Sequence, residues 1–215
     1  MQGTDKPQIG VVLFDVGGVL VELSGIETLI GWLGSGITAE ELWVKWLRSA
    51  AVRRFETGSS EASEFAQHVT QEFGLNIDPA RFLESFEGWP LGLYPGVKDM
   101  LARIPSRYRR ALLSNSNALH WPRMLDDMGL ESAFEHRFAS HLTGKIKPDS
   151  AAFEHVVATL GCAPQEVLFL DDNRLNVDAA NSIGMHAVRV VGPLEAQRAL
   201  VEFGIIEGDV DSDAP

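Results

Sequence analysis

The sequence predicts an α/β fold, in which a mostly parallel sheet is flanked by helices and a small all-helical unit is inserted after the first strand. Short, nearly continuous apolar runs recur along the 215 residues, as expected of strands that are buried on both faces. From Pro95 onward these runs alternate with helical patterns, which is typical of a parallel sheet with crossover helices. Between residues 22 and 93 the chain carries helix signals and no convincing strand, which predicts the insertion.

The apolar runs give the order of the expected strands. The first is Ile9–Phe14, and later runs lie at residues 111–113, 167–170 and 187–191, with a weaker one at 137–139. Two stretches between them repeat apolar residues near the helical period, at Phe153, Val156, Val157 and Leu160 and at Leu175, Ala179, Ala180 and Ile183. We therefore expect a Rossmann-like core that is built from residues 1–21 and 94–206.

Helix start signals mark the insertion at residues 22–93. Thr38 to Glu41 has the pattern of a capping box, and Asp78 precedes a proline at the first helical position. Apolar residues then repeat every four positions, at Leu42, Trp46 and Ala50 and at Phe65, Val69 and Phe73. We expect a helical cap that returns to the core at residues 94–97. The acidic residues 207–215 are expected to form a flexible tail.

The overall composition narrows the class of partner and the compartment. The formal net charge is −12, so binding to nucleic acid or to an anionic membrane, which clustered Lys and Arg would drive, is not expected. The single cysteine, Cys162, permits no intrachain disulfide. Because the chain shows neither a signal peptide nor an apolar stretch of about 18 residues, we expect a cytoplasmic protein.

Polar side chains follow several of the predicted strands. Asp15, Ser114 and the pair Asp171 and Asp172 each come where an apolar run ends, and Lys147 follows a weaker run. In an open parallel sheet these ends share one edge, where ligands bind. Two like charges about 4 Å apart cost roughly 4 kcal/mol at an effective dielectric near 20. A divalent cation and Lys147 would remove that cost, and a phosphate dianion would complete the balance of charge.

These segments, taken in order, resemble the motifs of the haloacid dehalogenase superfamily, in the branch whose small helical cap follows the first strand. Asp15 aligns with the nucleophile motif, Ser114 with the second motif, Lys147 with the third, and Asp171 and Asp172 with the fourth. The resemblance covers the chain from Ile9 to about Phe203. Residues 113–117 and 169–173 are also similar to bacterial sugar-phosphate phosphatases that act on α-D-glucose 1-phosphate.

The resemblance implies a Mg²⁺-dependent attack on phosphorus. Asp15 would form an aspartyl-phosphate, which divides one hard hydrolysis into two steps. Mg²⁺ would be held by the Asp15 carboxylate, the carbonyl of Gly17 and Asp172, with Asp171 on a metal-bound water, although the last two roles could be reversed.

The same resemblance implies how the phosphoryl group of a small phosphorylated substrate is held. Ser114, the backbone N–H of Asn115 and Gly18 would bind phosphoryl oxygens. Lys147 would neutralise both Asp15 and the transferring group. Asp178 would either brace the site or lie on a helix surface.

One position departs from the family pattern. Phosphatases of the family usually carry a second Asp, the general acid and base, at the position of Gly17. Such catalysis is typically worth about 10²–10⁴-fold. The departure leaves three readings: a slow enzyme, a substitute group, or a substrate whose leaving group needs little help, as an anomeric oxygen does. His120 is the nearby histidine to consider as a substitute, although a structural or pocket-wall role suits it better.

The sequence thus favours a Mg²⁺-dependent phosphatase of a small metabolite, with a sugar phosphate expected. A metal-independent 2-haloacid dehalogenase is the first alternative, but it has no need for the adjacent acids Asp171 and Asp172. A catalytically impaired protein that binds phosphate or a partner is the second. The physiological substrate is left open, as is the choice between monomer and homodimer.

Overall fold

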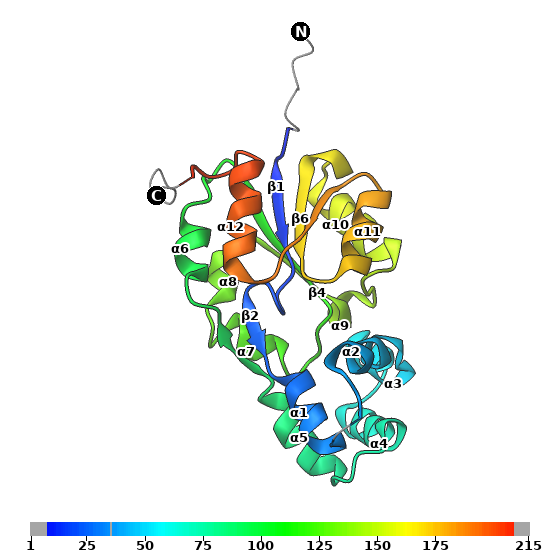
Figure 1. Cartoon of the computed structure of the whole chain (residues 1–215). Coiled ribbons are helices and arrows are strands. Elements are labelled where there is room, and N and C mark those ends of the chain that lie inside the picture. The colour runs from blue at the N-terminus through cyan, green and yellow to red at the C-terminus, as the bar shows by residue number, and fades with distance from the viewer. Residues whose placement is uncertain (1–7, 35, 209–215) are drawn as a thin grey trace.

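A parallel five-stranded sheet lies at the centre of the core in residues 8–34 and 36–208, the part of the chain that the computed structural model describes (Figure 1). The strand order is β5-β4-β1-β6-β7. The strands are β1 (Val11–Phe14), β4 (Arg109–Ser114), β5 (His136–Ala139), β6 (Val167–Asp171) and β7 (His186–Arg189). This confirms the expected α/β fold, including the weak strand near residue 138.

Alternate side chains of the buried strands pack into two apolar layers, one on each face of the sheet. Val12 and Phe14 of β1 pack into the cluster that includes α6 (Val97–Ala102) and α12 (Gly192–Glu202). Val11 and Leu13 pack into the opposite cluster, with α10 (Ser150–Leu160) and α11 (Arg174–Ser182). Figure 1 shows these helix pairs on the two sides of the sheet. Because both faces are covered, the strands have the near-continuous apolar sequence seen above.

The helical insertion is present, with its own apolar core. Its helices are α1 (Gly25–Leu33), α2 (Ala39–Arg48), α3 (Ala50–Glu56), α4 (Ala62–Phe73) and α5 (Pro79–Glu87). Buried aromatic residues fill its centre, among them Trp46, Phe65, Phe82, Phe86 and Trp89. Thr38 and Glu41 form the expected capping box, and Asp78 caps α5. The insertion faces the edge of the sheet where the strands end (Figure 1).

One expectation for the insertion is wrong. A two-stranded antiparallel ribbon, β2 (Val21–Leu23) and β3 (Pro90–Leu93), joins it to the core, where no strand was expected. The two strands have only three and four residues, and β3 contains a proline and a glycine, so neither carries a period-2 pattern. We propose that this ribbon connects the cap to the core. The boundaries between the two would then lie between residues 21 and 22 and between residues 93 and 94, as the sequence predicts.

Short elements complete the core. They are α7 (Trp121–Leu125), α8 (Leu130–Ala133), α9 (Ser140–Thr143) and the 3₁₀ turn Pro164–Glu166. Among the helices in the described part, none is long and apolar enough to cross a membrane. Of the predicted tail, residues 209–215 lie outside the described residues.

Candidate active site

The ends of the three central strands bring the predicted residues together. Asp15 directly follows β1, Ser114 ends β4 and Asp171 ends β6, and β4 and β6 are the two neighbours of β1. Asp15, Ser114 and Asp171 are all buried. The apolar sequence of the strands therefore fixes where these polar groups are placed, although they lie far apart in the chain.

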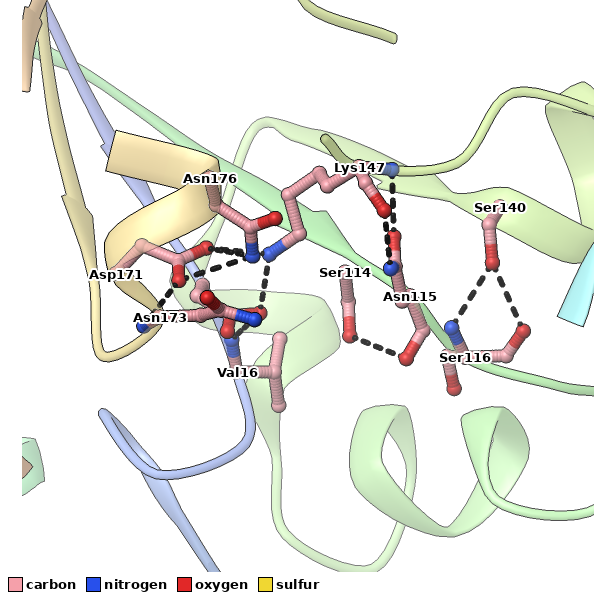
Figure 2. Close-up of polar contacts among 10 residues, drawn as sticks. Val16, Ser114, Asn115, Ser116, Ser140, Lys147, Asp171, Asn173 and Asn176 are labelled. Carbon is pink, nitrogen blue, oxygen red and sulfur yellow. Dashed lines mark hydrogen bonds and ion pairs between the residues drawn. The ribbon is translucent and has the colours of Figure 1, made fainter. Parts of the chain in front are cut away.

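Lys147 joins two of the carboxylates. Its ammonium nitrogen lies 2.8 Å from Asp15 Oδ1 and 2.7 Å from Asp171 Oδ2, and its side chain is almost completely buried (Figure 2). Burial by itself would lower the pKa of Lys147, but the carboxylates of Asp15 and Asp171 outweigh it and raise that pKa above its usual value. The lysine is therefore a fixed positive charge at this edge of the sheet.

Asn115 holds the backbone of Lys147 in place. Its side-chain amide donates to the Lys147 carbonyl at 2.9 Å, and its amide oxygen accepts from the Lys147 N–H at 2.9 Å (Figure 2). The next residue, Ser116, is held by Ser140. Its N–H donates to Ser140 Oγ at 3.0 Å, and its carbonyl accepts from the same hydroxyl at 3.0 Å. These contacts connect the end of β4 to the loop that carries the lysine.

The sequence analysis missed the partners that hold Asp171. The amide of Asn176 donates to both oxygens of Asp171, at 3.1 and 3.0 Å, and the Asn173 N–H donates to Oδ1 at 2.8 Å (Figure 2). Asn173 also caps α11. The sequence does carry a signal for Asn176, because this residue lies in the first turn of the helix that follows Asp171 and Asp172.

Three carboxylates converge beside this lysine. Oxygen atoms of Asp15, Asp171 and Asp172 lie within 4.8 Å of one another. Desolvation, together with the neighbouring carboxylates, raises the pKa of Asp15 well above its usual value, although Lys147 opposes that rise. Desolvation and the charge of Asp171 likewise raise the pKa of Asp172 to about 6. The group has more negative than positive charge, so it is suited to a further cation.

The two glycines of the nucleophile segment fit this arrangement. Gly18 has a φ of +72°, and a Cβ atom added there would overlap the carboxylate of Asp172. A Cβ at Gly17 would lie 2.6 Å from Leu23 Cδ1. The backbone of residues 17 and 18 thus approaches the acidic group closely, so it can contribute a carbonyl or an N–H to a bound ion or ligand.

A cavity of about 230 Å³ lies between the cap and this edge of the core. The core contributes Asn115, Lys147 and Asn173, among others, and the cap contributes Arg48, Arg53 and Glu56 together with apolar side chains of α2 and α3. Leu175 lines the same cavity and is 58% exposed, although it falls in the apolar repeat of its helix. Glu56 was also missed, because nothing in its local sequence separates it from other cap glutamates.

A family model for haloacid dehalogenase-like hydrolases matches residues 9–184 of the chain. The protein belongs to this family. Two relatives show its range. A phosphoglycolate phosphatase of Pseudomonas putida is 27% identical over 187 residues, covering 83% of this chain and 68% of the relative. An (S)-2-haloacid dehalogenase of Xanthobacter autotrophicus is 25% identical over 191 residues, covering 85% and 75%.

Solved structures show the same fold. A haloacid dehalogenase family enzyme of Bacteroides thetaiotaomicron, in complex with magnesium and inorganic phosphate, has a TM-score of 0.66 and 23% identity, covering 84% of this chain and 93% of that one. The L-2-haloacid dehalogenase of Xanthobacter autotrophicus has a TM-score of 0.62 and 21% identity, covering 96% and 92%. A family enzyme in complex with magnesium and phosphate and a dehalogenase thus share the fold of this haloacid dehalogenase-like hydrolase.

Two residues that the sequence analysis weighed for the site make their contacts elsewhere. His120 is buried and stacks on Phe86, whose carbonyl accepts from Nε2 at 2.6 Å, while Nδ1 pairs with the amide of Asn117 at 3.2 Å. Burial lowers the pKa of His120 to about 4. Asp178 is exposed and pairs with Arg174 on the helix surface at 2.9 Å, so of the two alternatives it takes the surface one.

Proposed function

We propose that this protein is a Mg²⁺-dependent phosphatase that hydrolyses a small phosphorylated metabolite through an aspartyl-phosphate. The observation that carries the proposal is the meeting of three carboxylates, with oxygens within 4.8 Å of one another, around one buried lysine. A metal ion and a phosphoryl group together balance such a charge distribution. The phosphoglycolate phosphatases among the relatives support the same chemistry.

We propose that the metal ion binds at the cluster of three carboxylates, where negative charge is in excess. Asp15, the carbonyl of Gly17 and Asp172 would hold Mg²⁺, and Asp171 would hold a metal-bound water. Both oxygens of Asp171 already accept from Lys147, Asn176 or Asn173, which supports Asp172 as the direct ligand. When bound, Mg²⁺ supplies charge neutralisation for the three carboxylates and for phosphoryl oxygens.

The chain's own groups then position the reaction. Asp15 Oδ1 accepts from the Val16 N–H at 2.7 Å and from Lys147, so the carboxylate is fixed before it attacks phosphorus. Ser114, the Asn115 N–H and Gly18 would bind phosphoryl oxygens, and Lys147 would offset the charge on both partners. Preorganised charge of this kind accounts for most of the rate enhancement in phosphoryl transfer.

The finer substrate class is a proposal of its own. The resemblance to glucose 1-phosphate phosphatases favours a sugar phosphate. The small cavity also holds Arg48, a partner for a carboxylate such as that of phosphoglycolate. A panel that contains α-D-glucose 1-phosphate, phosphoglycolate and simple alkyl phosphates separates the two kinds of substrate.

We expect phosphate release from at least one small ester in Mg²⁺ and its loss when the metal is chelated. Chloride release from 2-chloropropionate is measured in parallel, with and without Mg²⁺. Metal-independent chloride release with no phosphate release would make the protein a dehalogenase. Silence in both assays, with phosphate binding detected by calorimetry, would make it a binding protein.

Gly18→Ala is expected to weaken Mg²⁺ binding and phosphate release together. The new methyl group would displace Asp172, and the left-handed backbone costs a non-glycine residue about 1–2 kcal/mol. Calorimetric titration with Mg²⁺ and thermal unfolding measure the two effects. Gly10→Ala is the control, since a Cβ there meets nothing within 4 Å. Normal Mg²⁺ affinity in Gly18→Ala would contradict the placement of Asp172 in the metal site.

A further inference from the structure

The core leaves the position of the usual general acid empty of polar groups. Gly17 occupies that position, and the space where its side chain would begin is filled by Leu23, at 2.6 Å from an added Cβ. His120 does not replace the acid, because both of its ring nitrogens are engaged. A leaving group that needs a proton would then take it from another element.

The geometry of phosphoryl transfer shows from which direction it would come. The attacking and leaving oxygens lie roughly in line with phosphorus. Figure 1 shows the cap facing the edge of the sheet where β1 ends. With Asp15 attacking from that edge, the leaving oxygen would point away from the sheet and toward the cap. The water that later hydrolyses an aspartyl-phosphate approaches from the same side. A single group on the cap can therefore serve both steps.

Glu56 lies on that side. It is the last residue of α3 and the one carboxyl group among the residues that line the cavity in the described part of the chain. The side chain of buried Trp46 stabilises the charged form of its carboxyl group. The charge of Lys147 reaches it as well. Since Lys147 also contacts Asp15 directly, the nucleophile and Glu56 belong to one electrostatic site.

Contacts on both sides of Glu56 hold this part of the cap against the core. Arg53, one turn earlier, pairs with Asp149, two residues after Lys147. Gly58, two residues later, has a φ of +70°, and a Cβ there would come within 2.5 Å of the His141 carbonyl oxygen. Both contacts place the end of α3, and with it Glu56, beside the core.

We propose that Glu56 is the general acid and base of this enzyme, supplied by the cap in place of the residue that Gly17 lacks. The inference rests on the proposed phosphatase function. In the first step the Asp15 oxygen bonds to phosphorus, the ester P–O bond breaks, and the Glu56 proton passes to the leaving oxygen. In the second step the water oxygen bonds to phosphorus and gives its proton to Glu56. The bond between phosphorus and Asp15 breaks, and Asp15 leaves as a carboxylate.

The protonation of Glu56 agrees with this role. Desolvation raises its pKa to about 7, against the opposing effects of Trp46 and Lys147, so both forms are populated near neutral pH. The other charged and titratable groups on the elements around it are Arg48, Arg53, His141, Lys147 and Asp149. Loss of the acid form should make phosphorylation of Asp15 slower as the pH rises through about 7.

The test is Glu56→Gln in the Mg²⁺-loaded enzyme, with two esters that differ in leaving group. With an alkyl phosphate, we expect phosphorylation of Asp15 to fall by roughly 10²–10⁴-fold. With p-nitrophenyl phosphate, whose leaving group needs no proton, one equivalent of nitrophenolate should be released in a burst. Turnover should then be slow because the phosphorylated enzyme accumulates, which intact mass detects. The fall in rate above about pH 7 should be absent with the alkyl ester.

Two variants accompany this test. Glu84→Gln removes an exposed carboxyl from α5 of the same cap and should leave kinetics unchanged. Glu56→Asp keeps an acid in the cavity and should recover part of the lost rate together with the pH dependence.

Each outcome gives a decision. If Glu56→Gln raises KM equally for both esters, with kcat and the pH profile unchanged, Glu56 only binds substrate and the proposal is wrong. Wild-type rates in Glu56→Gln would also overturn it. If the wild-type protein releases no phosphate from either ester, the proposed phosphatase function fails first.

Discussion

Asp15→Asn should reduce phosphate release by up to about 10⁶-fold, the size of loss found when a protease nucleophile is removed. The amide has nearly the shape of the carboxylate, but it is a poor nucleophile and cannot form the aspartyl-phosphate. It also removes one of three mutually repelling negative charges, so the free energy of unfolding should be unchanged or higher. Phosphate release and denaturant unfolding measure the two effects.

Asp178→Asn is the matched control for Asp15→Asn. It makes the same chemical change at an exposed helix position, where the carboxylate pairs with Arg174 on the helix surface. We expect wild-type turnover from it. Asp15→Ala guards against deamidation of the asparagine back to aspartate. Residual activity above a few per cent in both Asp15 variants would remove Asp15 from the role of nucleophile.

Lys147→Met has the second large expected effect, on both stability and activity. The methionine nearly fills the space of the lysine stem but leaves Asp15 and Asp171 buried without their shared cation. Removing one partner of a buried ion pair costs about 3–5 kcal/mol. Turnover should also be lost, because no other buried cation joins the nucleophile to the phosphoryl group in the described part of the chain.

Mg²⁺ should restore part of the stability of Lys147→Met, because it would neutralise the same carboxylates. At 100 times its dissociation constant, a ligand of the native state adds about 2.7 kcal/mol. The gain should exceed that of the wild type, measured from denaturant midpoints with and without Mg²⁺. Lys145→Met is the control, since its ammonium contacts a backbone carbonyl, at 3.4 Å, rather than a carboxylate. Equal Mg²⁺ gains in the wild type and Lys147→Met would contradict a shared site for the lysine and the metal.

Local sequence was enough to predict which side chains meet at one edge of the sheet. Asp15, Ser114 and Asp171 each end a run of buried residues, and adjacent parallel strands necessarily end at one edge. Lys147 was predicted from charge balance and from its match to the third family motif, and the structure places its ammonium between two of the acids. The capping box at Thr38 and the cap of α5 at Asp78 were equally readable, since such signals span four residues or fewer.

Other features depend on contacts between distant segments, which no local pattern records. The ribbon of β2 and β3 pairs residues about 70 positions apart, and its strands are too short to show a period. Leu175 has the spacing of a core residue, yet it faces the cavity because the cap stands over the start of α11.

The sequence resembles the family in its motifs, and by itself it determined the parallel core and the row of charged groups at the ends of its strands. These properties follow from burial, from strand direction and from the need to balance buried charge, and each is encoded in a few neighbouring residues. Only the tertiary structure decided how the cap meets the core. The pairing of Arg53 with Asp149 and the approach of Gly58 to His141 bring Glu56 to the cavity, because packing between separate units depends on both surfaces at once.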